Sequence, residues 1–460
     1  MMKRYVLVAC LMMFTGKLFA QGIEFSHGTW KEVLAKAKQE DKLVFVDVYT
    51  SWCGPCKKMV AEVFPLKEVG EVFNPNFVNY KIDAEKGEGI EIAKKFGVKS
   101  YPTYLFVNGD GELVYRSGGY NLPKIFLNEA AIAIKEKHDP KPLAKWEDEY
   151  TAGKRDKDFL KGYIRKRAVV KVPNGPLLEE VFPLLTANDL SDKDFMGSVF
   201  AFDPNMTFVP GGKFYGHVVA NHAALDQLLG KREGYVLSLM DVGTQQYFNT
   251  DIIKNNREQL LPVMLATKRK LMELMKRDEI DVELKGLVMN YYKGTKNAKK
   301  LVPAAHDYVN NSLLNLDIQA RIAADKAAYQ KMREPYLSGK QDSTKVENWA
   351  SMQRISANQK MVDFSYKLRS AAQAVYALVD DPKILTQAIE WAKMAESYFP
   401  HFSTEAVYAG LLMKIGKKTE AAEMMLKASK DGFIQGNDKQ KLLLANVEKL
   451  KKGEAPEELW

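Results

Sequence analysis

The sequence predicts a two-part protein, in which an α/β domain with a central mixed sheet flanked by helices is followed by an all-α region of repeat type. Over residues 21–138, short β-rich apolar runs alternate with stretches of helical spacing. From residue 143 onward apolar residues recur at helical spacing, and strand signals are few. Residues 138–142 (HDPKP) are typical of a linker between the two parts, because two prolines two positions apart break any helix.

The first helix and the first strand of the domain have clear signals. Thr29 and Glu32 stand at the spacing of a capping box, so we expect a helix from Trp30 onward. The run Leu43–Tyr49 (LVFVDVY) is almost continuously apolar and β-rich, which predicts a strand buried on both faces. Shortly after it, Pro55 occupies a position that suits the first turn of a helix.

The remaining elements continue this alternation. We expect a strand over 77–82, a helix ending near 96, a hairpin of strands over 103–107 and 113–115, and a helix over 121–137. Gly97 is a typical helix stop. The Asn-Gly-Asp-Gly sequence at 108–111 is a typical hairpin turn. Together these elements form a βαβ pattern followed by a hairpin.

The composition excludes several classes of protein. The chain has 460 residues, of which 46% are hydrophobic and 27% charged; this is ordinary for a globular protein and excludes collagen-like, mucin-like and wholly disordered chains. Three cysteines are too few for a disulfide-stapled scaffold. The formal net charge of +9 is spread along the chain and gives no argument for nucleic-acid binding.

Residues 1–20 have the three-part layout of a secretory signal peptide. A basic start is followed by the apolar run Tyr5–Phe14, and Ala20 ends the segment before polar sequence begins. The run is shorter than the roughly 20 residues that span a bilayer, so a retained anchor is the less favoured alternative. A second alternative is a lipoprotein cleavage box that ends at Cys10. We expect an exported protein, periplasmic or secreted, without stable membrane insertion.

After removal of that segment, Cys53 and Cys56 are the remaining cysteines. A structural zinc site needs four ligands, and the sequence has no second cysteine pair and no histidines at ligand spacing. A structural disulfide that closes so small a loop would stabilise little. A redox-active dithiol fits better than either, because C-x-x-C beside a βαβ pattern is its signature. We therefore expect no metal and no cofactor other than the cysteine pair itself.

Four motifs occur here in a fixed order: Asp47 six residues before the first cysteine, WCGPCK at 52–57, FGV at 96–98 and YPT at 101–103. In this order and spacing they resemble the thioredoxin family, and the resemblance extends over residues 22–138. It implies a thioredoxin fold and the activity of a thiol–disulfide oxidoreductase.

The placement of the two cysteines at a predicted helix start favours Cys53 as the nucleophile. Helix amides and the positive end of the helix dipole stabilise a thiolate there. Cys56, one turn into the helix, should be shielded and should resolve the mixed disulfide by intramolecular attack. The intervening Gly54-Pro55 resembles the dipeptide of reducing thioredoxins, whereas a histidine there makes a disulfide more oxidising. The sequence therefore favours reduction of client disulfides over oxidation of client thiols.

Asp47 interrupts an otherwise apolar strand, and an unpaired buried carboxylate is costly. By resemblance, Asp47 is the buried acid beneath Cys56, with a raised pKa and the ability to shuttle the proton of that thiol. The alternative is a carboxylate turned outward at the strand end. The family's usual lysine near this acid should fall near Asn79, which puts a coupled Asp–Lys pair in doubt. Lys81, two positions on along the same face, is the candidate substitute.

Three further residues are expected to contact substrate. By resemblance, Pro102 is a cis-proline facing the dithiol, which leaves the backbone of Tyr101 free to pair with an extended substrate segment. Tyr101 is bulkier than the family's common aliphatic residue, so it would narrow substrate choice or add an aromatic contact. Trp52 is expected as a flat, partly exposed surface beside Cys53. Core packing is the alternative for both aromatic residues.

The helical part divides into a domain over 139–345 and a repeat region over 346–460. In the repeat region, Thr386-Gln-Ala and Thr419-Glu-Ala lie 33 residues apart, and Ala395 and Ala428 keep that offset. Small residues at fixed points let paired helices approach closely, and the pattern resembles tetratricopeptide repeats. A generic array of helical hairpins is the alternative.

Together these features predict an exported thiol–disulfide oxidoreductase that reduces disulfides of client proteins, with a helical region that docks partners. A reductase in an oxidising compartment needs electrons from elsewhere, which implies a membrane electron donor. The alternative function is a peptide-binding or chaperone-like interaction protein that uses the same fold.

Overall fold

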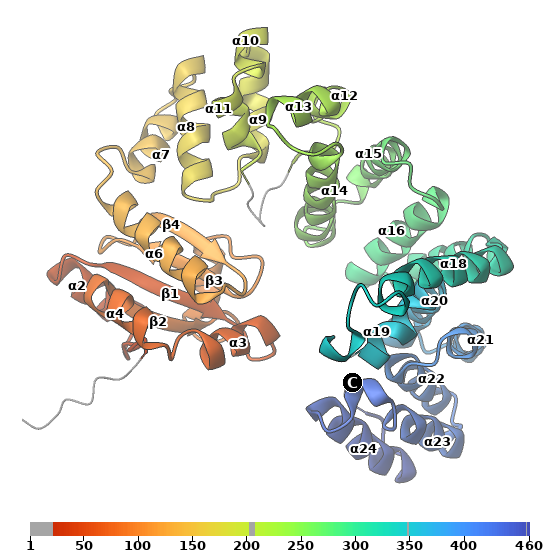
Figure 1. Ribbon diagram of the computed structural model, residues 1–460. Helices are drawn as coiled ribbons and strands as arrows, with labels where there is room; N and C mark the ends of the chain where they lie inside the picture. The colour runs from red at the N-terminus through yellow and green to blue at the C-terminus, as the bar shows by residue number, and fades with distance from the viewer. Residues whose placement is uncertain (1–21, 202–207, 347–348, 457) are drawn as a thin grey trace, which may run out of the picture. The chain divides into compact units, whose positions relative to one another are not determined.

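A computed structural model describes residues 22–201, 208–346, 349–456 and 458–460 (Figure 1). The predicted signal peptide, residues 1–20, lies outside these residues. The chain divides into two compact units, with the boundary between Thr250 and Asp251. The division into two units neither confirms nor contradicts the domain boundaries expected after residues 138 and 345, because it falls at a different position. These two boundaries stay predictions. The predicted fold class is confirmed, because a mixed sheet with flanking helices precedes a region that is mostly helical.

The sheet has four strands in the order β2-β1-β3-β4. The strands are β1 (Leu43–Tyr49), β2 (Phe77–Asp83), β3 (Thr103–Val107) and β4 (Leu113–Gly118). The pairing of β1 with β2 is parallel, whereas β3 pairs antiparallel with both β1 and β4. All four strands lie where the sequence predicts them, and β4 extends three residues beyond the expected end.

Helices lie on both sides of this sheet (Figure 1). They are α2 (Trp30–Gln39), α3 (Gly54–Glu62), α4 (Lys67–Asn76), α5 (Gly89–Lys95) and α6 (Pro123–Lys137). The predicted capping box is present at the start of α2, where the Thr29 hydroxyl accepts from the Glu32 amide and the Glu32 carboxylate accepts from the Thr29 amide. Gly97 has φ +59° just beyond α5, as expected of a helix stop.

Helix α4 was not expected from the sequence, because it contains Gly70 and Pro75, two residues that disfavour helix interiors. Both are tolerated for local reasons. Pro75 lies in the last turn of the helix. A Cβ at Gly70 would lie 2.4 Å from the carbonyl oxygen of Gly22, so only glycine allows the N-terminal segment to cross the helix this closely.

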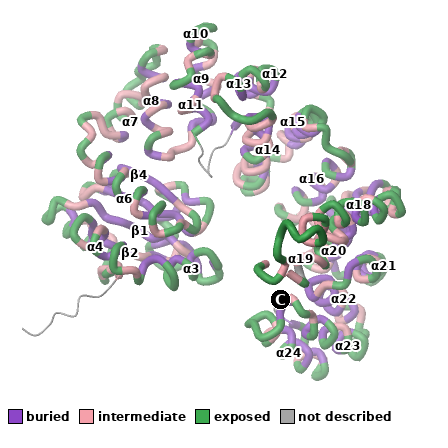
Figure 2. Tube along the Cα trace, in the orientation of Figure 1, coloured by how far each residue is buried: buried purple, intermediate pink, exposed green. Residues whose placement is uncertain are grey.

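The two faces of the sheet carry different cores, because successive residues of a strand point to opposite faces. One face is aliphatic, with Val44, Val46 and Val48 packed against residues of α2 and α5. The other face is aromatic, and Phe45 contacts the rings of Phe73 on α4 and Phe126 on α6 at centroid distances of 4.8 and 5.8 Å. Strand β1 is therefore buried on both faces (Figure 2). Asp47 projects from the aromatic face.

The rest of the first unit is helical among its described residues. Its elements are α7 (Leu143–Thr151), α8 (Lys157–Val169), α9 (Gly175–Val181), η1 (Phe182–Leu184), α10 (Ala187–Leu190), α11 (Lys193–Val199), α12 (Lys213–Ala220), α13 (His222–Leu228) and α14 (Tyr235–Tyr247). The π-helix η2 (Phe248–Ile253) contains the boundary between the two units.

Helix α8 is tied to the sheet domain by buried ion pairs. Lys166, 8% exposed, pairs with Glu136 at the end of α6 and with Asp139. Lys171, just beyond α8, lies 2.6 Å from Glu129 of α6, which also accepts a hydrogen bond from Tyr115 of β4. These contacts fix the first helices of the all-α part against α6 and β4.

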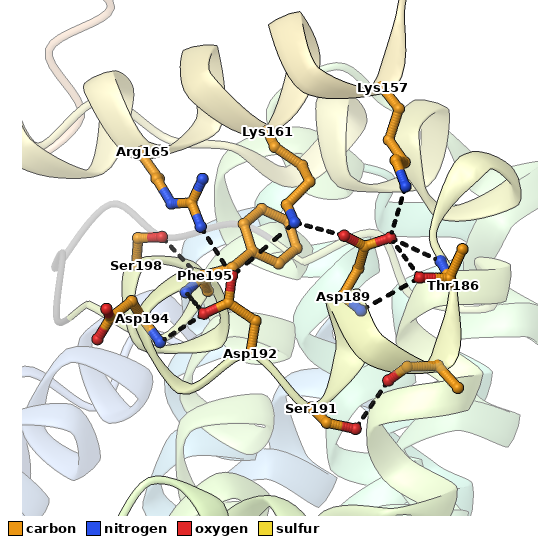
Figure 3. A network of polar contacts seen from close by, with 11 residues as sticks. Lys157, Lys161, Arg165, Thr186, Asp189, Ser191, Asp192, Asp194, Phe195 and Ser198 are labelled. Atoms are coloured by element: carbon orange, nitrogen blue, oxygen red, sulfur yellow. Dashed lines mark hydrogen bonds and ion pairs between the residues drawn. The ribbon is translucent and has the colours of Figure 1, made fainter.

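A second polar network joins α8 to the helices that follow it (Figure 3). Lys157, Lys161 and Arg165 lie one turn apart on one face of α8 and point toward two aspartates. Asp189 caps α10 and pairs with Lys157 at 3.1 Å, and Asp192 caps α11 and pairs with Arg165 at 2.9 Å. Each carboxylate therefore serves both its own helix start and the contact between helices.

In the second unit, all regular elements among the described residues are helices. Its elements are η3 (Glu258–Leu260), α15 (Leu261–Leu274), α16 (Ile280–Gly294), α17 (Ala298–Asn310), η4 (Leu313–Asn315), α18 (Ile318–Leu337), η5 (Ser343–Lys345), α19 (Trp349–Ser356), α20 (Gln359–Leu378), α21 (Pro382–Tyr398), α22 (Phe402–Lys414), α23 (Lys418–Ala428), η6 (Gly432–Ile434) and α24 (Asp438–Lys451). Ala395 of α21 and Ala428 of α23 are both fully buried, consistent with close helix packing at the repeated position. Membership of the tetratricopeptide family stays a prediction.

The buried pair at the junction gives a stability prediction. Replacing Lys166 by alanine should lower the free energy of opening of the sheet domain by about 3–5 kcal/mol, because it leaves the carboxylate of Glu136 buried without its partner. Hydrogen exchange of β4 and α6 amides in the full chain, read by mass spectrometry, measures this change locally.

Two variants serve as comparisons. Lys154→Ala removes an ion pair that is about half exposed and should leave exchange in β4 nearly unchanged. The double variant Lys166→Met, Glu136→Leu should recover most of the loss, since an apolar pair of similar volume replaces the buried charges. If Lys166→Ala exchanged like the native chain, the buried pair would not hold the junction.

Candidate active site

The two cysteines of the C-x-x-C motif form a disulfide at the start of α3. Cys53 is the N-cap residue, and its Sγ accepts the backbone N–H of Cys56 at 3.1 Å. Pro55 lies in the first helical turn, as the sequence predicts. In the reduced state a Cys53 thiolate would meet the same N–H and the positive end of the α3 dipole, which both stabilise negative charge.

Both cysteines are buried in the disulfide form. Cys53 is 2% exposed and Cys56 is 3% exposed, although the sequence suggested shielding for Cys56 alone. A client must therefore reach Cys53 through the side chains around it, or these side chains must move.

The aromatic residue before the disulfide is held by an acid that the sequence analysis did not identify. Trp52 is 63% exposed, and its Nε1–H donates to Glu85 at 3.0 Å. The ring of Tyr101 meets the indole edge-on at 5.8 Å. Glu85 follows β2 by two residues and Trp52 follows β1 by three, and the carboxyl ends of parallel strands meet at one edge of a sheet. That adjacency is the signal that would have identified Glu85.

The loop at Pro102 is fixed against the end of β4. The Tyr101–Pro102 peptide bond is cis, as predicted. The Pro102 carbonyl oxygen accepts the N–H of Gly119 at 2.8 Å, and the Thr103 hydroxyl donates to the Ser100 carbonyl at 2.8 Å. These bonds hold the Tyr101 backbone in a set position beside Trp52.

Asp47 is buried and paired with a lysine on the neighbouring strand. Its side chain is 1% exposed, and its Oδ2 lies 3.3 Å from the Nζ of Lys81. The family's usual lysine was expected near Asn79. Lys81 takes its place in this chain, because the register pairs Lys81, and not Asn79, with Asp47. Asn79 instead donates to the carbonyl of Glu24 and so holds the N-terminal segment.

The surroundings of this pair set its electrostatics. Burial raises the pKa of Asp47 to about 6, and the positive charge of Lys81 opposes this rise. Neither carboxylate oxygen accepts a directional hydrogen bond from the described residues. The Lys81 ammonium lies 4.6 Å from the ring centroid of Tyr49 and 5.9 Å from that of Phe64. Asp47 can therefore gain or lose a proton near neutral pH.

An apolar hollow gives water access to the lysine of the pair. Its volume is about 640 Å³, and it is lined by Gly22, Ile23, Phe25, Val60, Phe64, Pro65 and Lys81. Lys81 keeps 27% of its side-chain surface exposed, whereas Asp47 is 1% exposed. The ammonium group of Lys81 therefore lies between the carboxylate of Asp47 and solvent.

Neither a metal site nor a membrane span is found in the described part of the chain. No three histidine, cysteine, aspartate or glutamate side chains gather there as metal ligands would. No described helix combines the length and the apolar character needed to cross a bilayer.

Comparisons with known proteins place the similarity in the N-terminal part. The family model of the thioredoxin-like domain matches residues 30–131. Thioredoxin H4 of Arabidopsis thaliana is 33% identical over 96 residues, which cover 21% of this chain and 76% of that protein. Thioredoxin of Bacillus subtilis is 39% identical over 93 residues, which cover 20% and 83%. The solution structure of a candidate disulphide-isomerase from Bacteroides thetaiotaomicron is 46% identical over 25% of this chain and 96% of its own, with a TM-score of 0.24.

The raised pKa of Asp47 gives a pH-dependent stability prediction. Between about pH 4 and pH 6 the folded state binds more protons than the unfolded state, so the ionised carboxylate lowers stability as the pH rises through this window. Asp47→Asn should therefore be more stable than the native chain at pH 7.5, by about 2–3 kcal/mol, and the difference should fade near pH 4.

Urea unfolding of the oxidised full chain, read by pulsed hydrogen exchange in β1, measures this difference. Asp110→Asn is the matched control, because its carboxylate is 61% exposed and should show no such dependence on pH. An Asp47→Asn variant that is less stable at pH 7.5 would contradict the assignment.

Proposed function

The chain belongs to the thioredoxin family through its N-terminal domain, and from this premise we propose that it reduces disulfide bonds in client proteins. The domain is a thioredoxin-like oxidoreductase with a Cys53–Cys56 pair, and proteins of this kind use the pair itself in place of a cofactor. The observation that carries the proposal is the position of the disulfide at the N-cap of α3, where the helix start stabilises a Cys53 thiolate in the reduced state.

The reaction proceeds by two thiol–disulfide exchanges. The Cys53 thiolate attacks one sulfur of the client disulfide; a bond forms between Cys53 and the client, and the other client sulfur leaves as a thiolate and takes up a proton. Cys56 then loses its proton to Asp47 and attacks the sulfur of Cys53, which releases the second client sulfur as a thiolate. That thiolate takes up a proton, and Asp47 returns its own proton to solvent. The client gains two electrons and two protons, and the cysteine pair returns to the disulfide.

The direction of reaction rests on the residues between the cysteines. Gly54 and Pro55 carry no charge, so no imidazolium stabilises the Cys53 thiolate there. Less stabilisation of the thiolate makes the pair a stronger reductant. This favours reduction of clients over their oxidation.

The surface beside Cys53 is the proposed client site. Trp52 offers an exposed ring held by Glu85, and the fixed loop at Pro102 presents the backbone of Tyr101. An extended client segment would pair with this backbone and lie across the indole. Tyr101 adds bulk at this position and so favours narrow, extended segments over compact ones.

The helical part and the cell compartment complete the proposal. The helices after residue 138 would dock partners, and an exported reductase would receive its electrons from a membrane electron donor. The donor proposal rests on the predicted signal peptide and on the need to regenerate the dithiol after each turnover.

Activity is tested with insulin and dithiothreitol, in which reduction of insulin is followed as turbidity. The native chain should accelerate precipitation, and Cys53→Ser should fall to the rate without protein, because no thiolate remains to attack. Cys56→Ser is the matched variant: it keeps the attacking sulfur and should accumulate a mixed disulfide on Cys53, visible by non-reducing gel and mass spectrometry. Equal turbidity curves for the native chain and Cys53→Ser would refute the reductase proposal.

Export is tested by intact mass. When the full gene is expressed in a Gram-negative host, the protein recovered from the periplasm should begin at Gln21, and Ala20→Lys should retain the leader, because the cleavage site needs a small residue. A lipid-modified Cys10 would support the lipoprotein alternative instead, and an uncleaved cytoplasmic product would contradict export.

A further inference from the structure

The carboxylate of Glu85 is exposed and is bonded to a neutral partner. Both of its oxygens accept the Nε1–H of Trp52, at 3.0 and 3.1 Å. An indole N–H carries no charge, so this bond holds the ring and leaves the negative charge of Glu85 uncompensated. Within the described ranges of the chain, no lysine or arginine pairs with Glu85. The carboxylate has free lone pairs and can accept a charged partner without releasing Trp52.

Two aromatic rings form an open corner beside this carboxylate. The ring planes of Trp52 and Tyr101 are 84° apart, and their centroids are separated by 5.8 Å. Trp52 is 63% exposed, so most of the indole is open to solvent. The face of an aromatic ring attracts cations, and indole does so most strongly. A cation in this corner would meet two ring faces and the carboxylate of Glu85 at the same time.

A second acid adds to the negative charge of this corner. Asp83, the last residue of β2, accepts the backbone N–H of Glu85 at 3.0 Å and so fixes the short segment that carries Glu85. Burial raises the pKa of the Tyr101 phenol, and the charges of Glu85 and Asp83 raise it further, so both carboxylates act on the corner. Lys86 lies 3.4 Å from Asp83 and offsets one of the two charges. The corner therefore stays net negative.

The order of the strands gives the client site one acidic side. The order β2-β1-β3-β4 and the strand directions place the segments after β2 and after β4 on opposite sides of the disulfide. Glu85 follows β2. Tyr120 follows β4, and the ammonium group of Lys58 on α3 lies 6.0 Å from the centroid of its ring. A client segment held at Tyr101 thus has carboxylates on one side and a lysine on the other.

We propose that Trp52, Tyr101 and Glu85 form a binding site for a cationic side chain of the client, so that the protein favours disulfides with arginine or lysine within two residues of the client cysteine. An extended segment advances by about 3.3 Å per residue, and the long stem of either side chain spans the remaining distance. Arginine suits the site best, because its planar guanidinium both stacks on aromatic rings and binds carboxylates. The inference rests on the proposed reductase function and names the class of client.

The test uses two cyclic peptides that each contain one disulfide. One has arginine before each cysteine, and the other has citrulline, which keeps the shape of arginine without its charge. The reduced full-length chain, freed of reductant, is mixed with each peptide, and the peptide dithiol is quantified by chromatography after an acid quench. Each rate is divided by the rate of the same peptide with dithiothreitol, which corrects for the intrinsic reactivity of its disulfide. The native chain should reduce the arginine peptide about fivefold faster than the citrulline peptide.

Glu85→Gln should lose most of this preference, because the amide oxygen still accepts the N–H of Trp52 but carries no charge. Glu68→Gln is the matched control and should keep the preference, since Glu68 is exposed at the start of α4 and the exchange removes the same charge elsewhere. A Glu85→Gln chain with the native preference, or a Glu68→Gln chain without it, would overturn the assignment of the site to Glu85.

The same measurement separates this inference from the proposed function. Equal corrected rates for the two peptides with the native chain would overturn the cation site and leave the reductase proposal in place. A native chain that reduces neither peptide would contradict the reductase proposal, and the cation site would be overturned with it.

Discussion

The parallel pairing of β1 with β2 is the constraint on which the rest of the site depends. The register places Lys81 beside Asp47, and the shared direction brings Trp52 and Glu85 to the same edge of the sheet. On its other side β1 pairs with β3, whose first residue follows Pro102, so the disulfide and the cis-proline loop lie at one end of the strand. A shift of one residue would turn Asp47 into the aliphatic cluster and away from Lys81. One strand register thus fixes both the buried acid and the surface beside Cys53.

Both edges of this sheet are covered by other parts of the first unit. This gives a structural reason for the way α7 and α8 are attached to the sheet domain. At the β2 edge, the N–H of Ser26 donates to the Asn79 carbonyl at 2.7 Å, and the Asn79 side chain binds Glu24. At the β4 edge, α7 packs along the strand, and the ion pairs of α8 hold this arrangement. Exposed strand edges invite pairing with other chains, and covering both edges prevents it. The helices next to the sheet therefore have a structural role that does not depend on partner docking.

The sequence predicts the features of this domain that rest on local pattern, and it misses those that rest on register. The strands, the capping box at Thr29 and the dithiol at a helix start all follow from spacing within a few residues. Lys81 was named as the candidate partner of Asp47 from its spacing along the strand, but the pair itself was in doubt, because a single sequence does not give the pairing of two strands 34 positions apart. Glu85 and the pair of Lys166 with Glu136 were missed for the same reason, since each depends on segments that meet only after folding. Helix α4 was missed because packing overrides the poor propensity of Gly70 and Pro75.

The position of Lys81 sets how far burial perturbs the carboxylate of Asp47. A lysine buried as deeply as Asp47 would hold the carboxylate ionised, and the acid would no longer accept a proton near neutral pH. A lysine far from the strand would leave Asp47 without a charge partner in an apolar core, and its pKa would rise further. Lys81 lies between these extremes, because aromatic rings surround its ammonium group while more than a quarter of its side chain stays exposed. The stability lost by burying Asp47 is offset by the apolar packing on both faces of β1, and Lys81, which lines the hollow, is the charged group between the buried carboxylate and the surface.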